Sequence, residues 1–556
     1  MKIFIPCGAL QGPFPLPRTP PADRPLSPTA LLRHRSPSPT APSPTVTRSP
    51  LMSAPRSTGT TPPSAGAAAS GGLVERRSIE AVPDAERHGR PFSQFTLWFG
   101  ANLQITAVVT GALAVVLGAD AFWSLIALLL GNLLGGAVMA LHSAQGPRLG
   151  LPQMISSRAQ FGVYGAIVPL VCVVVMYVGF FASGTVLAGQ AVGHLTHLGD
   201  VTGIVVFALA TALTAVVGYR VIHRLGRVAS IVGALAFLYL GVRLLQRASL
   251  GDLLADHSFH LPAFLLAISL SASWQLAFGP YVADYSRYLP RDTSPRATFW
   301  CTLGGTVLGS QWSMAFGALA AAASAGAIAG DEVGYVVGLG GTGIIASVLY
   351  FVIALGKLTI NVLNTYGGFM SVLTGVTGFR AQRTLSQRGR AGYVLAIMLA
   401  GTVVALLGRG NFLDSFSTFL LFLLIFFTPW SAINLVDYYV IAKERYDLPA
   451  LSDPNGRYGG WRWRAIITYV LGILLQLPFI STEFYTGPLV DPLGGADISW
   501  IVGLVVPAAL YALLARGDRA ARVPEEMIWG GVESPEDALP PATAGDKAAL
   551  AGGAAG

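Results

Sequence analysis

The chain has 556 residues, of which 53% are hydrophobic and only 12% charged, and its mean hydropathy is +0.58. Soluble domains usually carry about 25% charged residues, so this composition excludes an ordinary water-soluble globule and favours a lipid bilayer as partner. The net charge of +8 does not indicate nucleic-acid binding, because the basic residues form short clusters between apolar runs, as in cytoplasmic loops.

The chain begins with a segment rich in Pro, Ser, Thr and Ala, residues 1–90, which predicts a disordered cytoplasmic tail. Its first apolar stretch is short and broken by Pro6, so no signal peptide is expected. Met52 is an alternative start that would shorten this tail. Residues 517–556 predict a second disordered tail, which leaves 91–516 as the predicted transmembrane transporter domain.

About twelve apolar runs follow one another within 91–516, each close to the roughly 20 residues that a spanning helix needs. The sequence therefore predicts an all-α integral membrane protein with about twelve transmembrane helices. The runs are centred near Thr106, Leu130, Val174, Ala208, Leu235, Ser271, Gly309, Ala354, Ala396, Leu424, Leu471 and Val505.

Lys and Arg cluster in the loops that follow the even-numbered runs, whereas the opposite loops carry few basic residues alongside acidic ones. Cytoplasmic loops are enriched in Lys and Arg. We therefore expect a multi-pass protein of the cell (plasma) membrane with both termini in the cytoplasm. Glycine pairs spaced by four residues, which allow close helix approach in lipid, occur at Gly131/Gly135, Gly189/Gly193 and Gly305/Gly309.

The first run, FTLWFGANLQITAVVTGAL (residues 95–113), carries Asn102, Gln104, Thr106 and Thr110 in an otherwise apolar helix. Polar groups at membrane depth are costly and indicate function. Carriers built from inverted repeats interrupt one helix in each repeat and bind ion and substrate there. Asn102 and Gln104 are therefore predicted to bind substrate; the alternative is that they only join neighbouring helices.

The third run, residues 168–192, contains Tyr177, Phe180 and Phe181, with Ser183 and Gln190 as polar neighbours. Phe180 and Phe181 are candidates for an aromatic wall of a substrate site. The alternative is that this aromatic stripe only packs between helices.

The sixth run contains Gly279-Pro280, which is expected to break the helix because proline removes a donor and clashes with the preceding turn. Trp274, Gln275 and Phe278 lie within two turns before it. An aromatic face with an amide suits a flat heterocycle, which needs ring stacking and edge hydrogen bonds. Broken helices in the first and sixth runs predict two five-helix repeats.

The eighth run carries Lys357, Thr359, Asn361, Asn364 and Tyr366 within ten residues. Asn361 and Asn364 share a helix face and are predicted to bind substrate. A deeply placed Lys357 is expected to mimic a bound cation or to exchange its proton during transport, with Thr359 beside it. The alternative is a lysine that snorkels to the interface.

The remaining signals do not support an enzyme. The glycines between Gly338 and Gly343 match G-x-G-x-x-G, but they follow no strand and lack a βαβ context. The histidines have no metal-ligand spacing, and no catalytic triad or carboxylate pair lies at membrane depth. No cofactor and no metal is therefore expected.

Four segments together resemble the purine–cytosine permeases, a family of nucleobase–cation symporters. They are RLGLPQMISSRAQFGVYG (Arg148–Gly165), VADYSRYLPRD (Val282–Asp292), NVLNTY (Asn361–Tyr366) and PWSAINLVDYYVIAKERYD (Pro429–Asp447). The resemblance covers roughly residues 91–516, in the order and on the spans of that family.

This resemblance implies a LeuT-type fold, with ten helices as two inverted five-helix repeats followed by two C-terminal helices. It implies import of cytosine, a purine or a related heterocycle such as a hydantoin, allantoin or a thiamine-like compound. The substrate would lie between aromatics of the third and sixth spans, with amides from the first and eighth. Asn361, Asn364 and Tyr366 match the fungal-type N-x-P-N-N-Y pattern, whereas Leu363 and Thr365 depart from it. The third span lacks the tryptophan of several members, so Phe180 or Phe181 would replace it.

The residues of the eighth run indicate which ion is coupled to transport. Sodium-coupled members of the family carry adjacent hydroxyl residues there, whereas here Thr359 follows Lys357 and Leu358. An ammonium nearby would repel Na⁺, so coupling to H⁺ is favoured and Na⁺ is the alternative. An amino-acid or vitamin carrier on the same fold is the main rival function, and a channel or membrane sensor is the rival of a different class. The sequence does not determine which base is carried or the oligomeric state.

Overall fold

The computed structural model describes residues 81–217, 219–324, 326–379, 387–482, 484–518 and 520–524. Most of the two predicted tails, residues 1–80 and 525–556, lies outside the described residues. Within the described ranges the chain is almost entirely helical. The exception is a short antiparallel hairpin of β1 (Ser481–Thr482) and β2 (Tyr485–Thr486).

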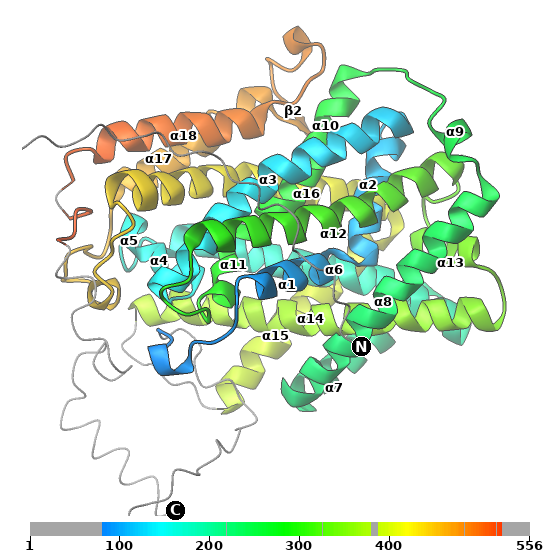
Figure 1. Cartoon of the computed structure of the whole chain (residues 1–556), viewed down its shortest axis with the longest axis horizontal. Coiled ribbons are helices and arrows are strands. Elements are labelled where there is room, and N and C mark those ends of the chain that lie inside the picture. Colours follow the sequence, from blue (N-terminus) through cyan, green and yellow to red (C-terminus); the bar gives the residue numbers. More distant parts are fainter. Residues whose placement is uncertain are drawn as a thin grey trace, which may run out of the picture. The chain divides into compact units, whose positions relative to one another are not determined.

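Each of the twelve predicted runs falls on a helix or on a helix pair (Figure 1). The first run is split between α1 (Phe92–Asn102) and α2 (Ile105–Val116), and the sixth between α10 (Leu261–Leu276) and α11 (Gly279–Ser286). The other runs form α3 (Ala121–Leu149), α6 (Ile167–Thr196), α7 (Asp200–Val217), α8 (Tyr219–Arg247), α12 (Pro295–Ser324), α14 (Ile344–Phe379), α15 (Gln387–Gly408), α16 (Phe412–Leu435), α17 (Trp463–Leu474) and α18 (Ser499–Ala515).

Short helices connect these elements. They are η1 (Asp84–Glu86), α4 (Gln153–Ser156), α5 (Arg158–Phe161), α9 (Leu250–Leu253), α13 (Glu332–Gly340), η2 (Arg409–Asn411), the π-helical turn η3 (Val436–Ile441), η4 (Pro449–Ser452), η5 (Leu477–Phe479) and η6 (Asp491–Leu493).

By length and composition alone, six helical segments of the described chain are able to cross a membrane, or seven if the bent pair α1–α2 is one span. One of these segments, Gly389–Ile441, contains most of α15 and all of α16, while α7, α17 and α18 are shorter apolar helices. Helix α12 is long enough but less apolar, because the face that it turns to its neighbours carries hydroxyl residues. Five of them are fully buried: Thr298, Thr302, Thr306, Ser310 and Ser313.

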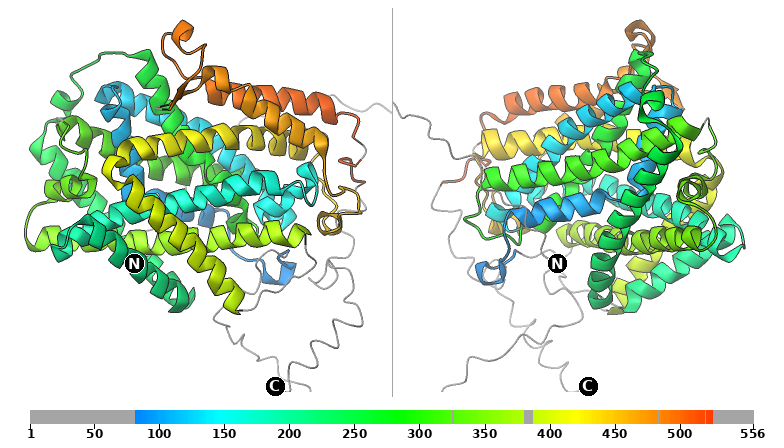
Figure 2. Two further views of the ribbon diagram at one scale, coloured as in Figure 1. Left: turned by 180° about the vertical axis from the view of Figure 1, so that it is seen from behind. Right: turned by 45° about the vertical axis from the view of Figure 1, so that its right-hand side comes forward.

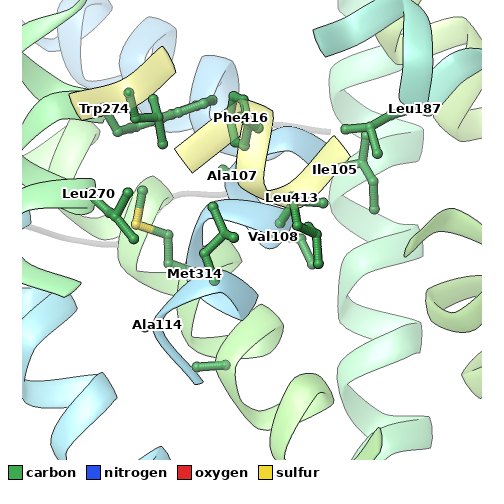
Figure 3. Close-up of a cluster of buried hydrophobic side chains, with 14 of the residues drawn as sticks. Ile105, Ala107, Val108, Ala114, Leu187, Leu270, Trp274, Met314, Leu413 and Phe416 are labelled. Atoms are coloured by element: carbon green, nitrogen blue, oxygen red, sulfur yellow. The ribbon is translucent and has the colours of Figure 1, made fainter. Parts of the chain in front are cut away.

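The long helices pack in three groups, which run side by side in Figures 1 and 2. The first group, α1–α2, α3, α10–α11 and α12, packs most closely within itself, and we refer to it as the four-helix group. The second group contains α6, α7, α8, α14 and α15, with α14 lying along α6. Helices α16, α17 and α18 form the third. A core of apolar side chains from α2, α6, α10, α12 and α16 joins the groups, as Figure 3 shows.

Glycines permit the closest helix contacts, as the four-residue spacings predict. A Cβ added at Gly305 or Gly309 of α12 would collide with the backbone of α1 at Phe95 or Phe99. A Cβ at Gly135 would likewise collide with the backbone of α10 at Ala272. The four-helix group is therefore held by direct backbone contact, which only glycine allows at these positions.

The two interrupted spans differ in how sharply they bend. The pair α1–α2 bends by 64° at Leu103 and Gln104, where Gln104 has extended torsions. By contrast, α10–α11 remains one span, because Ala277 and Phe278 keep right-handed helical torsions. Pro280 lies in the first turn of α11, where the absence of an N–H is tolerated. The predicted interruption at Gly279-Pro280 is present but weaker than the sequence suggests.

Residues 81–90, at the end of the stretch predicted as a tail, form a strap that is hydrogen-bonded to the transporter domain. The Val82 N–H donates to the Gly150 carbonyl at 2.9 Å, and the Arg87 side chain donates to the carbonyls of Val82, at 3.1 Å, and Pro147. The His88 N–H donates to the Tyr288 carbonyl at 2.6 Å. The strap therefore ties together the ends of α3 and α11 within the four-helix group.

Candidate substrate and coupling site

The break between α1 and α2 is organised by Asn102, which is fully buried. Its Nδ2 donates to the Trp98 carbonyl at 2.7 Å and to Thr306 Oγ1 at 3.0 Å. Its Oδ1 accepts from Trp274 Nε1 at 2.6 Å and from Ser310 Oγ at 2.8 Å. An Asn amide has two donors and two acceptor positions, so every hydrogen-bonding group of Asn102 has a protein partner in this structure.

Gln275 is also fully buried and occupied. Its Nε2 donates to Asn132 Oδ1 at 2.9 Å and to Ser310 Oγ at 3.0 Å, and its Oε1 accepts from Thr306 Oγ1 at 2.6 Å. Asn102 and Gln275 thus share the hydroxyl stripe of α12. Both bond within the four-helix group in this conformation.

Gln104 lies two residues after Asn102, on the other side of the break, and forms different contacts. It is half-buried, its Nε2 donates to the Ala101 carbonyl at 2.8 Å, and its Oε1 accepts from Lys357 Nζ at 3.0 Å. Lys357 also donates to Thr106 Oγ1 at 2.6 Å. The ammonium of α14 therefore sits at the break between α1 and α2, as a cation held by side-chain oxygens.

Lys357 is buried and forms no ion pair with any carboxylate in the part of the chain that the structure describes. A buried charge without an opposite charge is stabilised only by its hydrogen bonds. The two bonds to Gln104 and Thr106 therefore matter for both the position and the charge of this side chain. Thr359, two residues later, donates to the Leu355 carbonyl at 3.2 Å within its own helix.

Aromatic side chains from the third and sixth spans meet beside the break. The Trp274 ring contacts Phe180 and Phe278 edge to face, each with ring centroids 5.8 Å apart. Trp98 packs against Phe278 with centroids 5.3 Å apart. Phe180 is half-buried and has no polar group to anchor it, whereas Trp274 is held by Asn102 through its indole N–H.

The other predicted site residues lie farther along α6 and α14. Phe181 is fully buried and faces α15, where a Cβ at Gly401 would collide with its ring. Asn361 is fully buried, and its Nδ2 donates to the Phe181 carbonyl at 3.0 Å and to Thr185 Oγ1 at 2.9 Å, joining α14 to α6. Asn364 is 8% exposed, and its amide has no hydrogen bond within the described residues.

Sequence reasoning did not select several residues that complete this site. Thr106 is a direct partner of Lys357, and its signal in the sequence is a hydroxyl within the apolar first run. Thr306 and Ser310 saturate the amides of Asn102 and Gln275, and their signal was a hydroxyl at every fourth position of an apolar run. Gly184, which faces Lys357 and Asn361, left no signal, because an intramembrane glycine is common.

Comparison with known proteins decides the family. Residues 81–503 match the model of the permeases for cytosine/purines, uracil, thiamine and allantoin. This chain belongs to the purine–cytosine permease family. The resemblance found in the sequence is therefore confirmed, and the permease is a membrane transporter and not an enzyme.

The permease is similar over most of its length to two relatives with assigned names. It is 42% identical to YxlA of Bacillus subtilis over 80% of this chain and 96% of that protein, whose name assigns it provisionally to the purine-cytosine permeases. It is 25% identical to the purine-cytosine permease fcyB of Emericella nidulans over 79% of this chain and 88% of that protein.

The fold is that of Mhp1, a nucleobase-cation-symport-1 family transporter whose structure in a closed conformation has bromovinylhydantoin bound. The match has a TM-score of 0.63 at 19% sequence identity and covers 80% of this chain and 96% of Mhp1. The predicted fold class, an all-helical membrane transporter of the LeuT type, is confirmed.

Proposed function

We propose that this permease imports a nucleobase, cytosine or a purine, or a closely related heterocycle, by symport with protons. The family and the relatives support a small heterocyclic substrate. The contacts of Lys357 support protons as the coupling ion. Transport would proceed by alternating access, in which the four-helix group rocks against the α6–α14 group around a site near the membrane midplane.

The substrate would stack on Trp274, because hydrogen bonding to Asn102 fixes the plane of this indole. Phe180 would form the second wall, and its present edge-to-face contact with Trp274 would open to admit a ring. Gln104 would bind the edge of the heterocycle, since its carboxamide is half-buried and borders the break. Asn364, with a buried amide that has no partner among the described residues, is a second candidate for an edge contact.

The observation that carries proton coupling is the pair of bonds from Lys357 Nζ to Gln104 and Thr106. A sodium ion at this break would need these same oxygens, and an ammonium at the same position would repel it. A lysine can give up and regain a proton when its partners change. Lys357 is therefore the proposed coupling group, and Thr359 its neighbour on the same helix.

The distribution of Lys and Arg supports an orientation with both termini in the cytoplasm, in the cell membrane. In this orientation the strap and the loop with α4 and α5 face the cytoplasm. Reporter fusions at the two ends of the chain test this orientation, which an external reporter signal at either end would contradict.

The experiment is uptake of radiolabelled cytosine into cells that lack their own permeases. Saturable uptake that persists when choline replaces sodium, and that collapses with a protonophore, is expected. Competition by unlabelled adenine, hypoxanthine, uracil, allantoin and thiamine would then define the specificity. Uptake that requires sodium and ignores the protonophore would overturn proton coupling.

The matched variant is Lys357→Met, which keeps the length of the side chain and removes its charge. It should lower the accumulation of substrate against a gradient by at least about tenfold, which corresponds to about 1.4 kcal/mol. Exchange of internal for external substrate should continue. Full accumulation by this variant would exclude Lys357 as the coupling group.

A further inference from the structure

Lys357 joins two groups of helices that must move relative to each other. It belongs to α14, whereas both of its acceptors, Gln104 and Thr106, belong to the α1–α2 pair. If the four-helix group rocks, as the proposed function requires, these two bonds lengthen or break. The buried ammonium then needs another acceptor, or it must lose its proton.

One acceptor close to Lys357 stays with α14 during such a movement. Asn361 follows Lys357 by one helical turn, so the two side chains lie on the same face of one helix. Its Nδ2 is fully used by α6, but its Oδ1 is buried and has no hydrogen-bond partner. Buried polar atoms without partners are rare and destabilising. We therefore expect Asn361 Oδ1 to accept a hydrogen bond in another conformation of the protein.

Gly184 of α6 allows the side chains of Lys357 and Asn361 to approach that helix closely. A Cβ added at this glycine would collide with Asn361 Oδ1 and would lie only 2.7 Å from Lys357 Cε. The lysine side chain and the unpaired oxygen therefore border the same small volume. Any larger residue at 184 would fill it.

We propose that Asn361 Oδ1 is a second acceptor for the Lys357 ammonium, used when the α1–α2 pair moves away, with Gly184 keeping the path open. Asn361 is then a positioning residue for the coupling lysine rather than a direct substrate ligand. The proposal rests on the proposed alternating-access function.

One consequence concerns Gln104. When Lys357 turns to Asn361, Oε1 of Gln104 becomes free to accept a hydrogen bond from a substrate N–H. Ammonium and substrate therefore compete for one oxygen. A ligand drives a conformational change only through different affinities for the two states, and this competition supplies such a difference.

The first test needs no substrate. It is a double-mutant cycle of Lys357→Ala and Asn361→Asp, read as the midpoint of thermal unfolding of the purified full chain. Asn361→Asp should lower the midpoint by several degrees in the Lys357→Ala background, where the carboxylate is buried alone. With Lys357 present, the loss should be smaller by at least about 3 °C, because the two side chains pair.

Asn364→Asp is the control, since Asn364 is a largely buried residue of the same helix but lies seven positions from Lys357. It should lower the midpoint equally with and without Lys357. Equal losses for Asn361→Asp in both backgrounds would overturn the proposal, whatever the protein transports. If Asn361→Asp does not fold, Gly184→Ala takes its place in the cycle. Its methyl group would meet Lys357 Cε, so it should lower the midpoint by less after Lys357→Ala, and equal losses in the two backgrounds would overturn the proposal.

The second test is binding of radiolabelled cytosine to purified protein. Asn361→Asp should tighten binding about tenfold when Lys357 is present and change it less than about twofold after Lys357→Ala. Equal changes in the two backgrounds would refute the release of Gln104. If thermal coupling is found but the wild type binds no nucleobase, the proposed substrate is wrong and the second acceptor stands.

Discussion

At the scale of single residues, the proposed substrate site has one fixed aromatic wall, Trp274, and one movable wall, Phe180. Trp274 donates its indole N–H to Asn102 and is 2% exposed, whereas Phe180 is half-buried and is held by packing alone, with edge-to-face contacts to Trp274 and Phe419. A ring that enters between them must displace Phe180, since moving Trp274 would break its bond to Asn102 and leave the buried indole N–H without an acceptor.

Substitution at Phe180 tests this asymmetry. Phe180→Ala should weaken cytosine binding by about 1–3 kcal/mol, because it removes one stacking surface, whereas Phe180→Trp should keep or tighten it. Equilibrium binding to purified protein measures both. Equal affinities of the alanine variant and the wild type would show that Phe180 does not contact the substrate.

At the scale of helices, glycine contacts hold the four-helix group together. A Cβ at Gly111 of α2 would overlap the backbone of α12 at Met314, and a backbone cannot rotate away as a side chain can. Gly111→Ala should therefore lower stability by about 1–3 kcal/mol or more. Gly241→Ala is the control, because open space surrounds Gly241 in α8; it should leave stability unchanged or raise it by up to about 1 kcal/mol, since alanine is favoured over glycine inside a helix. Thermal unfolding of both variants measures the difference, and similar midpoints would argue against rigid backbone contact.

Helix α13 is joined to the end of α6 by acidic residues. Gln190 Nε2 donates to Glu332 Oε2 at 2.6 Å, and Gln190 Oε1 accepts from the Val333 N–H at 3.1 Å. The His194 ring lies 2.9 Å from an Asp331 carboxylate oxygen. Helix α13, which precedes the span of Lys357, is therefore attached to α6 through the side chains of Glu332 and Asp331.

This attachment predicts a pH effect. Burial raises the pKa of Glu332 above its ordinary value of 4.5. As pH rises through 4.5 the unfolded segment loses its proton first, so the stability of the docked α13 falls until pH passes the raised pKa. Hydrogen exchange of the α13 amides should therefore be faster at pH 7 than at pH 4.5, after correction for intrinsic rates. Glu332→Gln should reduce this difference; an unchanged difference in this variant would exclude Glu332 as its source.

At the scale of the whole molecule, a buried polar network joins the four-helix group to the helices around it. Gln145 of α3 donates to Asn434 Oδ1 of α16 at 3.0 Å and accepts from Gln153 Nε2 of α4 at 3.4 Å. His142 stacks on Trp430, with centroids 4.7 Å apart and planes at 15°. These contacts must break if α3 and α16 move apart at the end of the molecule that contains them. They therefore stabilise the conformation described here.

Breaking the central link should shift the balance between conformations. Gln145→Leu leaves Asn434 Oδ1 unpaired, at about 1–3 kcal/mol, and should increase opening at this end by roughly tenfold or more. The measurement is the labelling rate of a cysteine introduced at Ser157, a fully buried residue beside Trp430, in a background without other cysteines. Gln246→Leu, on the exposed side of α8, is the control and should leave the rate unchanged. A rate that does not rise in Gln145→Leu would mean that the network does not hold this end closed.

Sequence alone determined the class of this protein, the positions of its spans and the polar groups that interrupt them. These are local properties: hydropathy over about 20 residues decides what enters a bilayer, and proline or a polar pair marks an interrupted helix within a few turns. Lys357 and Gln104 are recognised as polar residues within apolar runs, and Trp274 by its place shortly before Gly279-Pro280.

Only the tertiary structure decided which of these polar groups are already occupied. The amides of Gln275 and Asn102 are hydrogen-bonded to the hydroxyl groups of Thr306 and Ser310 in α12. Lys357 donates to two residues that lie more than 250 positions earlier in the chain. The physical reason is that hydropathy is a property of each segment, whereas a hydrogen bond depends on which segments pack together. The unpaired oxygen of Asn361 and the space beside Gly184 exist only because α14 lies against α6.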